Sequence, residues 1–204
     1  MIDLDEIQHD ALVELFNIGV GKAAASMSGI IGGEVTMSVP SISFLNRVDA
    51  AEVLAPGGHR RICGVSQHYE GLFDTEAILM FPEEKSLDLV RLMVGERVPL
   101  EELSEMEQEA MSEIGNIILN SCVGSLANMF ASELRGSLPV YHAGTSEDIL
   151  DAVGEKGGTM VMMLHIEFVV ATQQIHGYVA FLLDVSSLHN LKDQINKYIA
   201  RMMG

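Results

Sequence analysis

The sequence repeats a set of residues at a fixed spacing, and this constrains the fold more than any other feature. Three residues recur identically after a shift of 99 positions: Glu14, Asn17 and Pro40 become Glu113, Asn116 and Pro139. The same shift takes Asp10 to Glu109, which preserves the carboxylate. We therefore interpret residues 1–204 as a single domain made of two repeats, about 1–100 and 101–204.

The first half has the pattern of a long helix followed by strands and a second helix. Apolar residues recur at helical spacing over residues 5–31, with Asp5 as the N-cap and Gly32 as the stop. Gly19 and Gly21 lie inside this helix and predict close packing against another element. The other expected segments are a strand over 34–45, a connecting stretch around 56–58, a hairpin with strands over 61–69 and 72–81, and a helix over 82–93 that ends at Gly95.

The second half predicts the same order of elements. Ser104 and Glu107 form a capping-box pattern at the head of a helix that runs to about Leu134 and stops at Gly136. The other expected segments are a strand over 139–143, a short helix over 147–153, strands over 159–170 and 175–183, and a last helix over 186–202. Because each half alone would leave an apolar face bare, we expect the two copies to share one sheet, which gives an α/β (α+β) fold.

The charge of the chain narrows the classes of partner. The net charge is −17, from 29 acidic and 12 basic side chains, and a field of this sign repels nucleic acids and anionic lipid headgroups. We therefore expect protein partners, no nucleic acid and no membrane. The N-terminus lacks the basic and apolar regions of a signal peptide, and no apolar run approaches the roughly 18 residues of a membrane span, so we expect a cytoplasmic protein. Cys63 and Cys122 do not form a disulfide framework or a metal-ligand pattern.

The repeated residues share a helix face in each half. Asp10, Glu14 and Asn17 are spaced by four and three positions, so they stack on one side of the first long helix. Glu109, Glu113 and Asn116 do the same on the second. A single such triplet is usually an ordinary solvent-exposed face. However, asparagine is a poor residue for a helix interior, and its recurrence together with glutamate and proline at one offset favours a functional role.

The chemistry of a glutamate and an asparagine points to positioning rather than to strong acid–base catalysis. A carboxamide both donates and accepts hydrogen bonds, so it can hold one water molecule in one orientation. A carboxylate can pair with a cation such as a lysine of a partner. These groups suit the hydrolysis of a bond that is already reactive, and phosphoryl transfer is of this type. The segment Gly19–Lys22 does not have the spacing of a phosphate-binding loop, and we interpret it as helix packing.

The pattern Asp10-x-x-x-Glu14-x-x-Asn17, followed by Pro40, resembles the signature of the CheC/CheX/FliY phosphatases of bacterial and archaeal chemotaxis. The neighbouring segments 14–21 and 38–40 resemble CheC-type members of this family in particular. The resemblance covers nearly the whole chain, including the duplication. It implies a pseudo-twofold sheet flanked by two long helices, and hydrolysis of the aspartyl phosphate of the response regulator CheY.

The resemblance also implies a role for each motif residue. Asn17 and Asn116 would orient the attacking water, and Glu14 and Glu113 would pair with a lysine of CheY. CheY would supply Mg²⁺, so that the chain needs no cofactor or metal of its own. The supporting motif residues are Asp10, Pro40, Glu109 and Pro139. The family usually has Asp or Ser where this chain has Glu109, so the second site departs from the pattern at one position.

The sequence is also compatible with partners beyond CheY and with other functions. The family also binds the receptor deamidase CheD, for which we expect a surface near the short helix at Asp148, Ile149 and Leu150. The main alternative to a phosphatase is a non-catalytic adaptor that binds CheD or acts as a flagellar switch component. A hydrolase with its own metal is a weaker alternative, because no His or Cys has metal-ligand spacing. The presence of both Glu–Asn pairs, and a chain that ends after the last expected helix, favour the enzyme.

Overall fold

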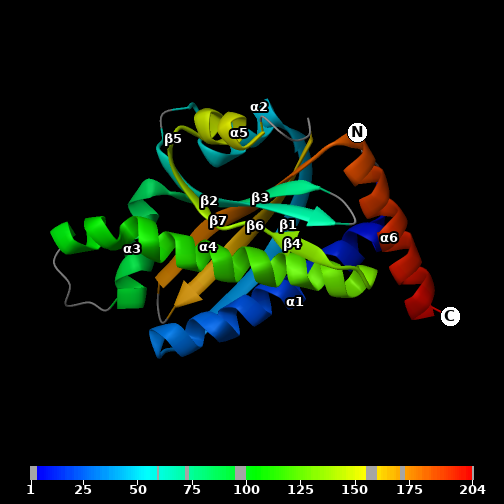
Figure 1. Ribbon diagram of the computed structural model, residues 1–204, viewed down its shortest axis with the longest axis horizontal. Coiled ribbons are helices and arrows are strands. Elements are labelled where there is room, and N and C mark those ends of the chain that lie inside the picture. Colours follow the sequence, from blue (N-terminus) through cyan, green and yellow to red (C-terminus); the bar gives the residue numbers. More distant parts are fainter. Residues whose placement is uncertain are drawn as a thin grey trace.

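The computed structural model describes residues 4–58, 60–71, 74–94, 100–154, 160–170 and 173–203 (Figure 1). Over these residues the chain forms six helices and one seven-stranded sheet in which all strand pairs are antiparallel. The elements of the first half are α1 (Glu6–Ile31), β1 (Val35–Asn46), α2 (Arg47–Leu54), β2 (Ile62–Gly71), β3 (Thr75–Pro82) and α3 (Glu83–Val94). Those of the second half are α4 (Leu100–Phe130), β4 (Leu134–Gly136), β5 (Val140–Gly144), α5 (Ser146–Gly154), β6 (Met160–Val170), β7 (Gln173–Leu183) and α6 (Val185–Met203).

The strands of the two halves interlock within the sheet. The strand order is β1-β6-β7-β3-β2-β4, and β5 also pairs with β2. The first strand of each half therefore lies beside the hairpin of the other half. Ile62 pairs with Gly144, and Leu45 pairs with Val161, so these two pairs are related by the same shift of 99 positions. The predicted fold class is confirmed, and the matching order of elements supports our interpretation of one domain built from two repeats.

The two long helices cover one face of the sheet, and the two short helices cover the other (Figure 1). In Figure 1, α1 and α4 run side by side in opposite directions, with α3 at one end of the layer and α6 at the other. The larger core lies beneath these helices and includes Phe16, Ile114 and Phe181. A smaller core, which includes Leu150 and Met163, lies beneath α2 and α5. The sheet thus separates a larger core from a smaller one.

A glycine sets the distance between the long helices. A Cβ atom at Gly19 would lie 3.1 Å from the Cα atom of Cys122 and 3.1 Å from the carbonyl oxygen of Ser121, so α1 and α4 approach closely at this point. The close packing predicted for Gly19 is confirmed. For Gly21 it is wrong, because no atom lies within 4 Å of its Cβ position. The helix also begins and ends as predicted, with Asp5 accepting a hydrogen bond from the Gln8 N–H and Gly32 in the left-handed conformation.

A helix that was not predicted lies between the first strand and the connecting stretch around residues 56–58. Asn46 caps α2, and its Oδ1 atom accepts a hydrogen bond of 2.9 Å from the Asp49 N–H. Asn46 is an ordinary N-cap residue, so the signal was present in the sequence. The eight-residue helix has only a weak apolar stripe, formed by Ala50, Ala51 and Leu54, and its periodicity is therefore hard to detect.

The limits of the second long helix also differ from the prediction. Helix α4 begins at Leu100, so Ser104 lies inside it and not at its N-terminal cap position. The Glu107 carboxylate instead accepts hydrogen bonds from the hydroxyl groups of Ser86 and Tyr141. The helix ends at Phe130, and Ala131 turns the chain with a φ of 50°. Gly136, the predicted stop, lies in strand β4 beside Tyr69.

Candidate functional site

The first candidate site lies on the outer face of α1. Asp10 and Glu14 are exposed to solvent, and Asn17, one turn beyond Glu14, is partly buried. Pro40 is exposed in strand β1. The carboxylate of Asp10 lies 3.8 Å from His9 Nδ1. The helix therefore presents two carboxylates to solvent and directs its asparagine toward the neighbouring strand.

The carboxamide of Asn17 bonds to the backbone of that strand. Its Oδ1 atom accepts a hydrogen bond of 2.8 Å from the Val39 N–H, and its Nδ2 atom lies 3.4 Å from the Val39 carbonyl oxygen and 3.0 Å from that of Val13. The pairing of β1 with β6 shifts register between Ser38 and Ser41, which leaves the Val39 peptide groups to Asn17. Pro40 has no N–H to donate within this irregularity. The predicted motif residues Asn17 and Pro40 thus meet at one bulge.

The second candidate site lies on the outer face of α4. Glu109 and Glu113 are exposed, and Asn116 is partly buried, as in the first site. The Oδ1 atom of Asn116 accepts a hydrogen bond of 3.2 Å from Gln67 Nε2 and one of 2.7 Å from Asn120 Nδ2. Asn116 is therefore held by side chains, whereas Asn17 is held mainly by the backbone.

The hydrogen bonds of Gln67 continue into the sheet. Its Nε2 atom also donates to the carbonyl oxygen of Ser137 at 2.9 Å, and its Oε1 atom lies 3.0 Å from the hydroxyl group of Tyr69. The same hydroxyl group lies 3.0 Å from Asn120 Oδ1. Burial raises the pKa of Tyr69 above its ordinary value, so the hydroxyl group remains a donor. Gln67, Tyr69 and Asn120 form with Asn116 a connected polar group, which we call the Asn116 network.

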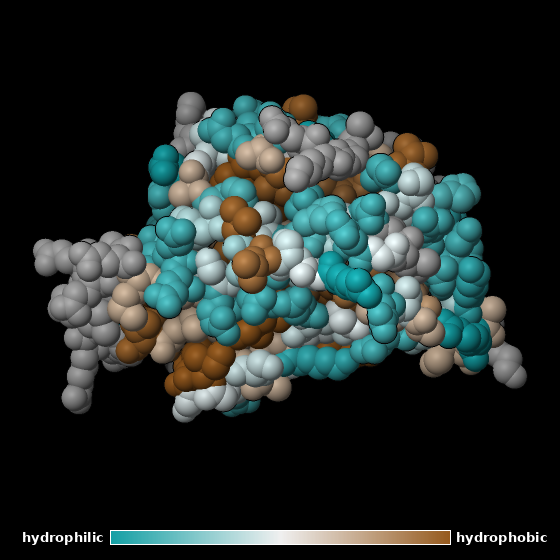
Figure 2. Space-filling model, viewed as in Figure 1, coloured by the Kyte–Doolittle hydropathy of each residue, from teal (hydrophilic) through white to brown (hydrophobic). Residues whose placement is uncertain are grey.

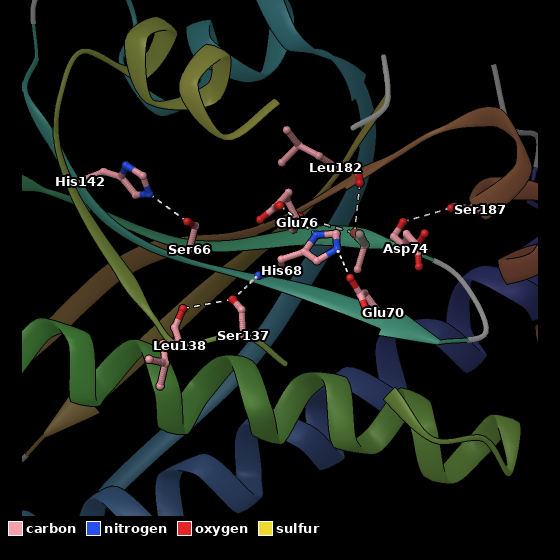
Figure 3. Close-up of polar contacts among 11 residues, drawn as sticks. Ser66, His68, Glu70, Asp74, Glu76, Ser137, Leu138, His142, Leu182 and Ser187 are labelled. Atoms are coloured by element: carbon pink, nitrogen blue, oxygen red, sulfur yellow. Dashed lines mark hydrogen bonds and ion pairs between the residues drawn. The ribbon is translucent and has the colours of Figure 1, made fainter. Parts of the chain in front are cut away.

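Ser137 is itself fixed in place at the edge of the sheet. Its N–H donates to the His68 carbonyl oxygen at 2.8 Å, and its hydroxyl oxygen accepts a hydrogen bond of 3.0 Å from the His68 N–H (Figure 3). Leu138 and Pro139 follow in the gap between β4 and β5. The position that corresponds to the buried Val39 is Leu138, whose side chain is 84% exposed. The two proline-containing segments therefore differ in burial as well as in hydrogen bonding.

The Asn116 network was not predicted from the sequence, although the sequence positions of two of its members, Asn120 and Gln67, are informative. Asn120 lies four positions after Asn116, and hence on the same helix face. Gln67 alternates with Val65 and Tyr69 on the side of β2 that faces α4, so it is a polar residue in an apolar register. Without knowledge that β2 packs beneath α4, this alternation does not connect Gln67 with Asn116.

Polar side chains also gather on the opposite side of the same strands. Ser66 Oγ lies 2.8 Å from His142 Nε2, and His68 Nδ1 lies 2.8 Å from Glu76 Oε1 without the geometry of a hydrogen bond (Figure 3). These four residues line a pocket of about 420 Å³ beside α5. No group of three or more His, Cys, Asp or Glu residues suited to a metal ion occurs within the described ranges.

The surface expected for CheD is largely buried. The side chains of Ile149 and Leu150 are 3% and 1% exposed and belong to the core beneath α2 and α5. Asp148 is exposed, and its carboxylate accepts a hydrogen bond from the Thr145 hydroxyl group. The two apolar residues therefore hold α5 on the sheet and are not available to a partner in this structure.

Comparisons with known proteins agree with the fold and with the predicted family resemblance. The chain is 26% identical to the "CheY-P phosphatase CheC" of Bacillus subtilis over 157 residues, which are 76% of this chain and 73% of that protein. It is 26% identical to a "Putative CheY-P phosphatase CheC1" of Halobacterium salinarum over 166 residues, 80% of this chain and 82% of that protein. No family model matches the chain.

Among solved structures, the FliY protein of Thermotoga maritima superposes with a TM-score of 0.79 at 19% identity, covering 97% of this chain and 100% of that one. The molecule thus shares with this FliY structure the fold of an antiparallel sheet packed against two long helices. In this chain each of the two long helices carries a Glu-x-x-Asn face. Together with the curated relatives, this confirms the predicted resemblance to the CheC/CheX/FliY family. None of the described helices is both long and apolar enough to cross a bilayer.

Proposed function

We propose that this protein hydrolyses the aspartyl phosphate of phosphorylated CheY in the cytoplasm. The main support is that two helices each present an exposed glutamate one turn before an asparagine whose carboxamide is held by specific hydrogen bonds. The relatives named CheY-P phosphatases support the substrate. Figure 2 shows the face with α4 as a mixture of hydrophilic and hydrophobic side chains, the composition of many protein–protein interfaces.

In this proposal each residue type has a separate task. Glu14 and Glu113 pair with a lysine of CheY and thereby dock the helix beside the phosphate. Asn17 and Asn116 orient a water molecule in line with the phosphorus–oxygen bond that breaks, which lowers the entropic part of the barrier. Asp10 and Glu109 lie one turn before these glutamates and extend the acidic face. Mg²⁺ belongs to the CheY substrate and neutralises charge on the phosphoryl oxygens.

The hydrogen bonds of each asparagine indicate which of its groups are free for this task. Both Asn17 hydrogens face backbone carbonyl oxygens, and its Oδ1 atom retains one acceptor position. Asn116 has the opposite arrangement, because two donors face its Oδ1 atom while its Nδ2 atom has no acceptor among the described residues. The first site thus offers an acceptor to water and the second offers donors.

The test is phosphate release from a purified, phosphorylated CheY receiver with and without this protein. We expect the wild type to accelerate release, each of Asn17→Ala and Asn116→Ala to lower the rate, and the double variant to leave only the hydrolysis of the receiver itself. Loss of a water-positioning group is expected to reduce the rate at its own site by about a hundredfold. Asn128→Ala, at an exposed position of α4, is the matched control and should behave as wild type.

Two results would contradict the proposal in different ways. Full activity of the double variant would show that hydrolysis does not depend on the asparagines. If the wild type binds the phosphorylated receiver or CheD but never accelerates release, the chain is a non-catalytic adaptor or a flagellar switch component. Glu14→Gln and Glu113→Gln should raise KM more than they lower kcat, because the glutamates act in docking.

A further inference from the structure

We propose that Gln67 is a positioning residue that sets the orientation of the Asn116 carboxamide, and that it serves the second site alone. This inference rests on the function proposed above and adds a residue that the helix motif does not contain. Gln67 lies on β2, its side chain is 2% exposed, and it reaches the site from beneath α4. A buried amide is unfavourable unless its polar atoms are bonded, and here both of them are.

The backbone of Ser137 determines which way the Gln67 amide faces. A carbonyl oxygen can only accept, so the Gln67 atom at 2.9 Å from it must be the NH₂ group. The second hydrogen of this group then points to Asn116, at 3.2 Å, and the atom that it meets must be Oδ1. The Asn116 Nδ2 atom is left to face outward. One fixed carbonyl group thereby orients two amides in sequence.

The anchor of this chain of hydrogen bonds is rigid. Ser137 exchanges two hydrogen bonds with the backbone of His68, one through its N–H and one through its hydroxyl oxygen, the second of which is drawn in Figure 3. β4, which ends at Gly136, pairs with the end of β2. Gln67 and the carbonyl group that orients it are therefore held by the same strand pair, and the amide cannot turn over without losing the Ser137 hydrogen bond.

The first site lacks this device at every corresponding position. A shift of 99 takes Gln67 to Ile166 and Tyr69 to Phe168, and the residue that corresponds to Asn120 is Gly21, so three polar residues correspond to two apolar residues and a glycine. Ile166 and Phe168 are fully buried in the larger core. The strand pairs that obey the same shift show that these positions also correspond in the sheet. Ile166 and Phe168 fill the corresponding positions with apolar side chains, so the core does not require polar groups there. Of these two pairs, the polar one, Gln67 and Tyr69, is the pair that lies beneath Asn116.

The experiment isolates the second site in an Asn17→Ala background. Gln67→Glu keeps the shape of the side chain but removes both donors, so a carboxylate faces the Ser137 carbonyl group and Asn116. Gln67→Ile introduces the residue type found at the corresponding position beneath the first site, Ile166, and removes the hydrogen bonds without burying a charge. We expect either change to lower kcat for phosphate release by about tenfold while KM for the phosphorylated receiver is unchanged, because Glu113 still docks.

The controls separate positioning from general structural damage. Urea unfolding should show that Gln67→Ile is folded, and Gln67→Ile should have no further effect once Asn116 is replaced by alanine. When Gln67 alone is replaced and both asparagines are intact, the first site should retain its activity. An unchanged kcat in both Gln67 variants would overturn the proposal.

A readout that does not depend on hydrolysis keeps this test distinct from that of the proposed function. The side-chain NH₂ resonances of Asn116 in an NMR spectrum of the free protein should shift in both Gln67 variants, and those of Asn17 should not. If the Asn17→Ala parent releases no phosphate, the proposed function fails while this spectrum still decides whether Gln67 orients Asn116. Unshifted Asn116 resonances would contradict the positioning role in either case.

Discussion

The two asparagine sites have the same motif but different supports. Asn17 is bound to the backbone at a bulge of β1, where it accepts from the Val39 N–H and donates toward two carbonyl oxygens. Asn116 is bound to the side chains of Gln67 and Asn120. Repetition of a sequence motif therefore does not repeat its surroundings. Asn17 is part of what holds a helix on a strand, whereas Asn116 is held from below and can change without opening the sheet.

The largest expected effect comes from a substitution of Gly115, the glycine beside Asn116. A Cβ atom at Gly115 would lie 2.5 Å from the Val65 side chain, so α4 rests directly on β2. The corresponding residue of the first half is Phe16, which packs against Phe181 with ring centroids 5.5 Å apart. We expect Gly115→Val to lower the free energy of unfolding by about 3 kcal/mol and to displace the second site, because the helix must move away from the strand.

Gly124→Ala on the same helix is the matched control for this change. No atom lies within 4 Å of its Cβ position, so alanine should leave the unfolding free energy unchanged or raise it by up to about 1 kcal/mol through helix propensity. Urea titrations of both variants measure the difference. Equal stability of Gly115→Val and the wild type would mean that α4 does not rest on β2 as described.

The next largest effect is a difference in stability between the alanine variants of the two asparagines. Asn17→Ala leaves the Val39 N–H without its partner, and the Val39 side chain is only 1% exposed, so we expect a loss of about 2 kcal/mol. Asn116→Ala should lose less than about 1 kcal/mol, because Gln67 keeps its bond to Ser137 and Asn120 is exposed to water. The urea midpoints of the two single variants check this. A loss for Asn116→Ala equal to that for Asn17→Ala would contradict the distinction between backbone and side-chain support.

The sequence predicted the two long helices that carry the candidate sites, the residues that share one face of each helix, and most of the strands of the sheet. These features depend on local periodicity and on caps such as Asp5 and Gly32, which are visible in a few neighbouring residues. The short helix α2 and the true start of α4 were missed. In α2 the apolar stripe is weak, and in α4 Glu107 bonds to Ser86 and Tyr141 from other elements instead of capping its own helix.

The difference between the two sites could not be predicted from the sequence, and the reason is physical. It depends on which strand lies beneath each helix, and the strands interlock so that α4 rests on β2, a strand of the other half. Gln67 and Asn116 are 49 positions apart and belong to different repeats. No local pattern connects them until the sheet order is known. The exposure of Glu14 and Glu113 could be predicted, because it depends only on the apolar periodicity of their own helices.

The smallest expected effect concerns two histidines on the face opposite to the asparagines. The shift of 99 takes Ser66 to His165 and Ser43 to His142, so the second half has a histidine at both positions where the first half has a serine. Burial lowers the pKa of both His142 and His165 below the ordinary value of 6.5, and the neighbouring His176 lowers that of His165 further. Because the unfolded chain binds these protons more readily than the folded one, stability should fall as the pH falls through 6.5 and below.

Urea titrations at a series of pH values from neutral to mildly acidic measure this dependence. His142→Gln and His165→Gln should each make the unfolding free energy less dependent on pH, because glutamine does not take up a proton in this range. The amide that His142→Gln introduces can still bond to Ser66, so the change at neutral pH should be small for this variant. A steeper loss of stability toward acid in either test variant would show that protonation of that histidine favours the folded state, against the sign derived from its burial.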